Sequence, residues 1–167
     1  MSSIIYLELT GDKQGLISSG CSSLQSIGNR SQLGHEDQIQ VLSLNHSITQ
    51  SLNHSMSYDD NLSCHPVELI KFIDKSSPLL GVSTSSNERL TANFFLYRVN
   101  SAGQLELFYE IKLTDARIVD ISCNYPHSIN NNEMMPYEKV LLKYNSISWE
   151  HKVAGTSGYS IWNDSIL

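Results

Sequence analysis

The sequence is poor in charged residues, and its basic residues are scattered. Of its 167 residues, 17% are Asp, Glu, Lys or Arg, whereas about a quarter is typical of globular proteins. The formal net charge is -6, and Lys and Arg form no cluster along the chain. Because proteins bind a phosphate backbone through gathered positive charge, nucleic acid is not an expected partner.

Long hydrophobic runs are also missing. The first apolar stretch, residues 4–9, has no basic segment ahead of it and is far shorter than a signal-peptide core or a membrane span. We therefore expect a chain that is made in the cytoplasm without a signal peptide and does not insert into a membrane.

Patterns that hold metals are absent as well. The three cysteines are too widely spaced for a disulfide framework or a zinc ribbon, which predicts reduced thiols. The six histidines, among them His46, His54 and His65, show none of the short spacings of zinc ligands. We expect no metal site and no cofactor.

The sequence contains no nucleophile motif, phosphate-binding loop or glycine fingerprint. One cluster, His35 with Glu36 and Asp37, could perform acid–base chemistry. Adjacent carboxylates at the entrance of a strand are more often solvated or paired across a subunit boundary. An enzyme is therefore not expected, and a hydrolase stays an alternative only if these three side chains line a concave pocket.

The chain does contain strand patterns that are apolar on both faces. Residues 137–151 read as one long strand, and its apolar residues occur in both parities: Val140, Leu142 and Tyr144 in one, and Leu141, Ile147 and Trp149 in the other. Residues 39–48, 94–99 and 105–121 share this property. An antiparallel sheet usually has one solvated face, so the second apolar set needs cover from elsewhere.

These patterns predict a mainly β protein, with one domain over residues 1–167. We expect an antiparallel barrel or sandwich whose outer faces and edges are completed by neighbouring copies. The apolar parity changes near Leu42, as a β-bulge would produce, and residues 115–116 are the expected bend in a strand too long to be straight.

Helix and loop signals complete the expected fold. Ser77 followed by Pro78 is typical of a helix start, which predicts a single short helix over about 77–86. The polar stretch 50–65 is expected to be an extended loop, and long loops without structure of their own are often functional. Residues 155–167 are expected to form a flexible tail.

Several segments carry a resemblance to a known family. The segment Ile73–Leu79, which leads from a strand into the expected helix, resembles the corresponding junction of the haemolysin-coregulated proteins (Hcp). These proteins are the tube subunits of bacterial type VI secretion systems. The segments Gly34–Ile39, Asn145–His151 and Ala154–Gly158 resemble the enterobacterial branch of the family.

The resemblance implies a β-barrel with one helix and a hexameric ring. Rings would stack into a tube inside a contractile sheath, tipped by a spike protein, and the tube would carry effectors into a target cell. Subunits of this kind are made in the bacterial cytoplasm, leave through their own secretion machine and are not enzymes. Phage tail-tube proteins share the fold, so a phage-tail-tube-like structural protein is the alternative.

The resemblance also places candidate contacts. It implies that the strand around Asn45 approaches the lumen, with Asn45 near an effector contact, and that the loop 50–65 reaches adjacent subunits or the next ring. The expected ring or inter-ring contacts in this loop are Tyr58, Asp59 and Asp60. Outside the loop, the expected contacts are Glu36, Asp37 and Trp149.

Overall fold

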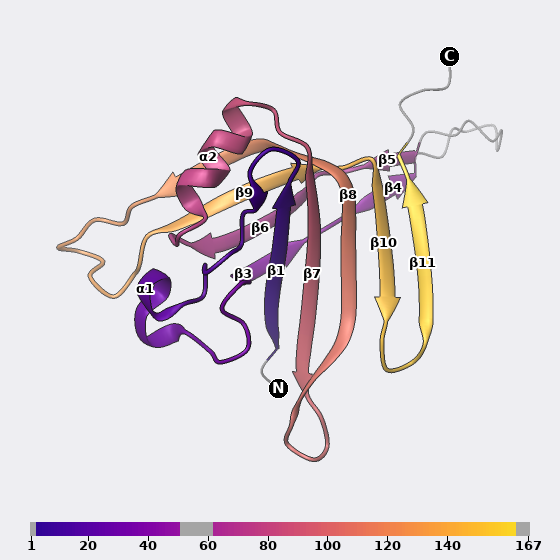
Figure 1. The fold of residues 1–167 in the computed structure, drawn as a ribbon, viewed down its shortest axis with the longest axis horizontal. Coiled ribbons are helices and arrows are strands. Elements are labelled where there is room, and N and C mark those ends of the chain that lie inside the picture. Colours follow the sequence, from indigo (N-terminus) through magenta and orange to yellow (C-terminus); the bar gives the residue numbers. More distant parts are fainter. Residues whose placement is uncertain (1–2, 51–61, 163–167) are drawn as a thin grey trace.

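The computed structural model describes residues 3–50 and 62–162, and it is mainly antiparallel β (Figure 1), which confirms the predicted class. The elements in chain order are β1 Ile4–Gly11, β2 Gly15–Leu16, α1 Leu24–Ile27, η1 Gly28–Arg30, β3 Ile39–Asn45, β4 Ile48–Gln50, β5 Leu62–Cys64, β6 Val67–Phe72, α2 Ser77–Ser85, β7 Leu90–Val99, β8 Leu105–Asn124, β9 Tyr137–Lys143, β10 Ser146–His151 and β11 Thr156–Ile161.

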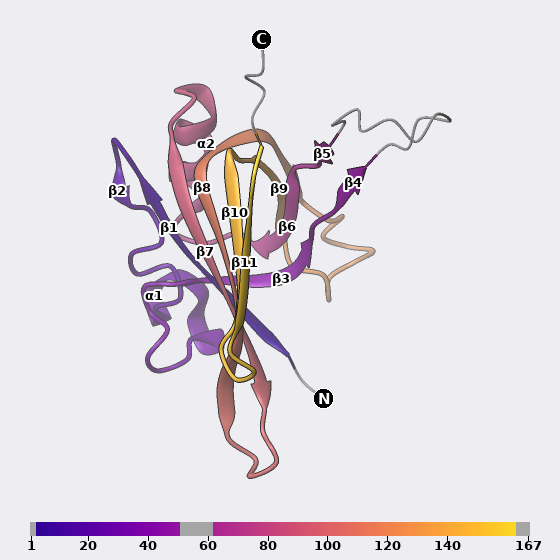
Figure 2. The same cartoon turned by 90° about the vertical axis from the view of Figure 1, so that its right-hand side faces the viewer.

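The main sheet closes on itself because β8 pairs with three strands. Its first half pairs with β7 on one side and β10 on the other, and its second half pairs with β9. The closed path runs β8–β7–β1–β3–β6–β9 and back to β8, so these strands form a barrel. Strands β10 and β11 continue from β8 as a two-stranded flap beside the barrel (Figures 1 and 2).

The predicted bend in β8 is present at Asp115. This residue has φ of 50°, in the left-handed region, which Asp tolerates better than most residues because its short side chain can bond locally. The Asp115 carboxylate accepts a hydrogen bond from Asn145 Nδ2 at 2.5 Å. The bend turns one 20-residue strand into two ladders with different partners.

The prediction of one long strand over residues 137–151 is wrong. The chain leaves β9 after Lys143 and re-enters the sheet at Ser146, so Tyr144 and Asn145 lie between two strands that pair with different halves of β8. Tyr144 and Ile147 are both buried, at 2% and 1% exposure. After the break, odd-numbered residues face the core where even-numbered ones did before it. Ile147 and Trp149 therefore pack in or against the same core as Val140 and Leu142.

A bulge has the same effect in β3. The register against β6 shifts between Val41 and Ser43, as predicted from the parity change. Ile39 and Val41 are buried before the bulge, and Leu44 packs against the core after it. Leu42, at the bulge, is exposed.

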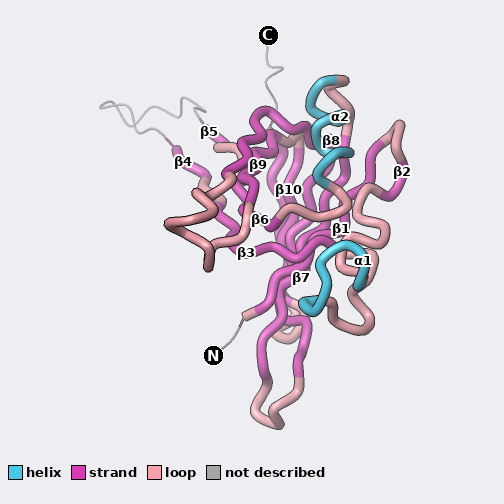
Figure 3. The backbone as a smooth tube through the Cα atoms, turned by 90° about the vertical axis from the view of Figure 1, so that its left-hand side faces the viewer, coloured by secondary structure: helices cyan, strands magenta, loops and turns pink. Residues whose placement is uncertain are grey.

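Helix α2 lies close to the residues predicted for it and packs at one end of the barrel through buried Leu80 (Figure 3). Its position is fixed by Glu88, which follows it. Glu88 Oε1 accepts hydrogen bonds from the backbone N–H groups of Lys13 and Gln14, and Oε2 accepts one from Ser83 Oγ. Burial alone would raise the pKa of Glu88, but these bonds outweigh it and lower the pKa to about 2.

A second short helix, α1, was not predicted. It occupies part of the connection between β2 and β3, where Leu24 is exposed and Ile17 is buried. The connection is therefore anchored in the core through Ile17 and not through Leu24.

A buried ion cluster joins two strands to the start of α2. Lys71 on β6 is fully buried and pairs with Glu138, directly opposite on β9, and with Asp74, whose Oδ1 lies 3.0 Å away. Ser77 Oγ donates to Glu138 at 2.8 Å. Buried charges need such partners, because an unpaired charge in a low-dielectric interior is costly.

The expected flexible tail is a strand over much of its length. Residues 156–161 form β11, which pairs with β10 from His151↔Thr156 to Ser146↔Ile161. Residues 163–167 lie outside the described residues, as do residues 51–61 of the expected loop 50–65. The ends of that loop form the β4–β5 ribbon, from Ile48↔Cys64 to Gln50↔Leu62.

Candidate cargo and assembly surfaces

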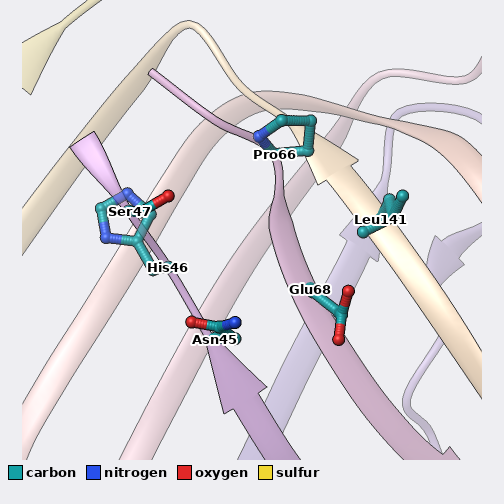
Figure 4. Close-up of a pocket in the computed structure, with 6 residues that line it drawn as sticks. All are labelled: Asn45, His46, Ser47, Pro66, Glu68 and Leu141. Atoms are coloured by element: carbon teal, nitrogen blue, oxygen red, sulfur yellow. The ribbon is translucent and has the colours of Figure 1, made fainter. Parts of the chain in front are cut away.

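Asn45 lies on the outside of the barrel at the end of β3. It is paired with Glu68 on β6, and Glu68 is paired with Leu141 on β9, so the three side chains form a row across neighbouring strands. With His46, Ser47 and Pro66 they line a shallow hollow of about 130 Å³ (Figure 4). The strands therefore bring the predicted cargo residue beside a carboxylate and an apolar side chain.

The hollow is polar, and its one carboxylate, Glu68, is paired with a lysine. Glu68 Oε2 lies 2.8 Å from Lys139 Nζ, and both side chains are partly exposed, so this pair contributes little to stability. The exposed Asn45 amide has both a donor and an acceptor. Such a surface can hydrogen-bond a polypeptide.

His46, which lies just before β4, connects the β4–β5 ribbon to the barrel through its side-chain contacts. Its Nε2 lies 2.8 Å from the hydroxyl of Tyr144, and its ring centroid lies 6.1 Å from that of Trp149 on β10. Burial lowers the pKa of His46. The sequence spacing of 98 residues between His46 and Tyr144 explains why sequence reasoning did not connect them.

The flap carries an open edge and exposed aromatic area. Among the described residues, β11 pairs only with β10, so its other edge is unpaired. Tyr159 and Ile161 on this strand are 77% and 57% exposed. The half-buried Trp149 and the exposed Tyr159 both line a hollow of about 470 Å³. Open edges of this kind accept strands from another chain.

A second exposed apolar surface lies in the connection between β8 and β9, residues 125–136. Four of its side chains are at least half exposed: Tyr125, Ile129, Met134 and Met135. This connection projects from the side of the molecule opposite the flap (Figure 1). Sequence reasoning missed this surface because the residues are isolated in a polar loop and show no periodicity.

His35, Glu36 and Asp37 each have a separate local role. The His35 ring stacks on Tyr6 with centroids 4.0 Å apart, Glu36 Oε2 accepts a hydrogen bond from the backbone of Gly34, and Asp37 Oδ1 accepts one from the backbone of Gly20. The three side chains do not converge on a shared atom. This arrangement gives no support to the hydrolase alternative, and the two carboxylates stay predicted ring contacts.

Within the described ranges, no group of His, Cys, Asp and Glu side chains is arranged to hold a metal ion. His65 Nε2 lies 3.1 Å from the Thr49 hydroxyl, and His54 lies outside the described residues. The described helices include none with the length and apolar character needed to cross a membrane. Tyr58, Asp59 and Asp60, the predicted contacts of the loop, also lie outside the described residues.

Comparison with known proteins gives a consistent result. The family model described as "Type VI secretion system effector, Hcp" matches residues 6–151. The chain is 38% identical over 171 residues to the "Major exported protein" of Pseudomonas aeruginosa strain PAO1, with 99% of each protein covered.

Solved structures share both the fold and the sequence pattern. A structure titled "Crystal structure of Hcp protein" has a TM-score of 0.90 and 33% identity, covering 98% of this chain and all of the other. The "Secreted protein Hcp3 from Pseudomonas aeruginosa" has a TM-score of 0.83 and 37% identity, with 98% and 100% of the two chains covered.

Proposed function

This chain belongs to the Hcp family of type VI secretion system proteins, and from that premise we propose that six copies close into a ring and that rings stack into the inner tube. Hcp proteins are structural, secreted proteins and not enzymes. The tube would lie inside a contractile sheath behind a spike protein and carry effectors. Its subunits would be secreted through this machine without a signal peptide.

The ring proposal is supported by one observation: each subunit has two different exposed apolar surfaces on opposite sides. The open edge of β11 with Tyr159 and Ile161 lies on one side, and the β8–β9 connection with Ile129 and Met134 lies on the other (Figure 1). A closed ring joins one patch of each subunit to a different patch of the next. Large exposed apolar patches also mark interaction sites.

We assign the outer face of β3, β6 and β9 to the lumen. Its row of Asn45, Glu68 and Leu141 is mixed in character, which suits transient contact with many cargo surfaces better than permanent burial. The β10–β11 flap and the β8–β9 connection are then free to form the walls between subunits.

The cargo role is tested by the substitution Asn45→Asp. It adds a second carboxylate beside Glu68 without changing side-chain volume, so we expect rings of unchanged mass that retain a co-expressed effector at least several-fold less well in a pull-down. Lys112→Glu, an exposed site on β8 outside the hollow, is the matched control. Unchanged retention by the Asn45→Asp ring would refute the cargo assignment and leave the ring proposal standing.

A further inference from the structure

The β4–β5 ribbon is joined to the barrel by side chains and not by a backbone ladder (Figure 2). Among the described residues, its two strands pair only with each other and form a sheet separate from the main one. A two-stranded sheet of this length is marginally stable alone in water. The side chains at its base therefore hold it to the barrel, and two of them, Ile48 and Cys64, pack in or against the core.

Both arms of the ribbon meet at one hydroxyl group, that of Tyr144. His46, just before β4, places its Nε2 atom 2.8 Å from this oxygen. Cys64, at the end of β5, is 3% exposed and hydrogen-bonds the same hydroxyl. Burial, followed by the contact with Cys64, raises the pKa of Tyr144, so the hydroxyl keeps its proton at neutral and acid pH. These two contacts form a latch between ribbon and barrel, which we call the Tyr144 latch.

A positive charge on His46 would weaken this latch. A neutral imidazole can accept the hydroxyl proton of Tyr144 at Nε2, whereas a charged imidazole can only donate there. Burial lowers the pKa of the half-buried His46, because it disfavours the charged form. The ring centroids of Tyr144 and Trp149 lie 5.9 and 6.1 Å from that of His46, at the limit of cation–π attraction. The two aromatic rings therefore compensate little.

The titratable groups around His46 supply no free negative charge. They are the Cys64 thiol on β5, the Tyr144 hydroxyl, and the carboxylate of Glu68 on β6, which lines the same hollow as His46. Glu68 Oε2 lies 2.8 Å from Lys139 Nζ on β9 and is paired with it. Within residues 3–50 and 62–162, the His46 imidazole has one hydrogen bond, to Tyr144. No ion pair in that part of the chain therefore stabilises a charged His46 in the closed latch.

The latch also shapes the proposed cargo hollow. This hollow lies where the two arms of the ribbon leave the barrel, with Asn45, His46 and Ser47 on one arm and Pro66 and Glu68 on the other (Figure 4). The first arm runs directly into β4, and the second follows directly from β5. A ribbon that moves away from the barrel therefore moves the walls of the hollow.

We propose that protonation of His46 opens the Tyr144 latch, so that the ribbon leaves the barrel and the hollow around Asn45 opens. Because the closed latch disfavours the charged imidazole, the latch is complete above pH 6.5, the ordinary pKa of His, and is lost as the pH falls below that value. The link to cargo rests on the proposed function, in which this latch makes the retention of cargo dependent on pH.

The two tryptophans of the chain report on the latch without any cargo. The Trp149 ring contacts His46 and the Trp162 ring contacts Tyr144, with centroid distances of 6.1 and 6.4 Å. Wild-type tryptophan emission should show one titration step between pH 7 and pH 5, with an unchanged far-ultraviolet circular dichroism spectrum. His46→Gln should abolish the step. His65→Gln is the matched control and should keep it, because the His65 side chain bonds within the ribbon, to a threonine of β4.

Hydrogen exchange measures whether the ribbon itself moves. After correction for the intrinsic exchange rate, the amides of residues 48–50 and 62–64 should exchange several-fold faster at pH 5.5 than at pH 7, and those of β1 and β7 should not. In Tyr144→Phe, which removes the shared hydroxyl, the ribbon amides should exchange fast at both pH values.

A bimane label reports on the hollow. It is attached to Asn45→Cys in a Cys123→Ser background, because Cys123 is the exposed native thiol. Its emission should change over the same pH range as that of the tryptophans, and adding His46→Gln should remove the change.

The outcomes separate this latch from the proposed function. A missing tryptophan step, or a step that survives in His46→Gln, would overturn the latch. A step without faster exchange in the ribbon would show that His46 binds a proton without releasing the ribbon, and would also overturn it. A bimane emission that stays constant would show that the hollow does not open. These measurements need neither cargo nor a ring, so a monomeric wild-type protein or a failed Asn45→Asp test contradicts the proposed function and leaves the latch standing.

Discussion

The hydroxyl of Tyr144 lies 2.8 Å from Nε2 of His46 and thereby joins the break between β9 and β10 to the base of the β4–β5 ribbon. Tyr144 is 2% exposed, so removing its hydroxyl leaves a half-buried imidazole without its partner. We expect Tyr144→Phe to lower the free energy of unfolding by about 1–2 kcal/mol. Urea unfolding at pH 7.5 measures this, with the exposed Tyr159→Phe as control.

The same pair predicts a pH dependence. Burial lowers the pKa of His46 below its usual value of about 6.5, so the unfolded chain binds this proton more readily than the folded one. Stability from this site is complete above pH 6.5 and falls as the pH drops from there toward the lowered pKa. His46→Gln keeps an acceptor without a titration, and the wild-type protein should lose stability relative to this variant between pH 7 and pH 5. Parallel curves would contradict the assignment.

Glu88 predicts a dependence at lower pH. Its pKa is about 2 in the folded protein, against an ordinary value of 4.5, so its stabilising effect is present above pH 4.5 and is lost as the pH falls toward 2. At pH 7, Glu88→Gln should lower the free energy of unfolding by roughly 2–3 kcal/mol. The gap between variant and wild type should narrow steadily below pH 4.5, as followed by urea unfolding across that range. A constant gap would show that charge is not what holds the β1–β2 turn.

Lys71 tests the buried ion cluster. Lys71→Met leaves Glu138 and Asp74 buried without their cation, and breaking such a pair costs about 3–5 kcal/mol. Because the cluster joins β6, β9 and α2, thermal unfolding should occur at a clearly lower temperature. Adding Glu138→Gln to Lys71→Met removes one of the stranded charges and should recover part of the loss. A double variant no more stable than Lys71→Met would argue against charge burial as the cause.

The flap edge predicts an assembly defect without a folding defect. Tyr159→Lys with Ile161→Lys places two cations on the exposed face of β11, and edge charges of this kind oppose strand addition and apolar contact. We expect monomers by light scattering with an unchanged circular dichroism spectrum. Val82→Lys, at a site 52% exposed on α2, is the control and should leave assembly intact. Six-membered rings of the double variant would exclude β11 from the interface.

Sequence patterns predicted where strands occur better than which way their residues face. The bulge near Leu42 and the bend at Asp115 were both readable, the first from a change of parity and the second from excessive strand length. The break at Tyr144–Asn145 was not predicted, because the only turn signal there is Asn145 followed by Ser146, and apolar residues continue the strand pattern on both sides of it. Each interruption resets parity, so apparently two-faced strands place most of their apolar side chains in one core.

That finding changes the physical argument for assembly. The need for neighbouring copies was inferred from strands that seemed apolar on their outer faces. In β9 and β10, however, the most exposed apolar residues are Leu141 and Trp149, and both are still half-buried. Two groups of exposed apolar side chains lie instead on β11 and in the β8–β9 connection, and others, such as Leu24 and Leu33, lie in the connection between β2 and β3. Neither could be read from the sequence, because a short Gly/Ser-rich strand and isolated apolar loop residues lack periodicity.

The mass of the assembled wild-type protein tests the central proposal most directly. Native mass spectrometry at micromolar concentration, with negative-stain images of the same sample, should give six times the 18.7 kDa mass of one chain and rings around an open channel. A single mass of 18.7 kDa that persists at high concentration, or an assembly that encloses no channel, would contradict the account.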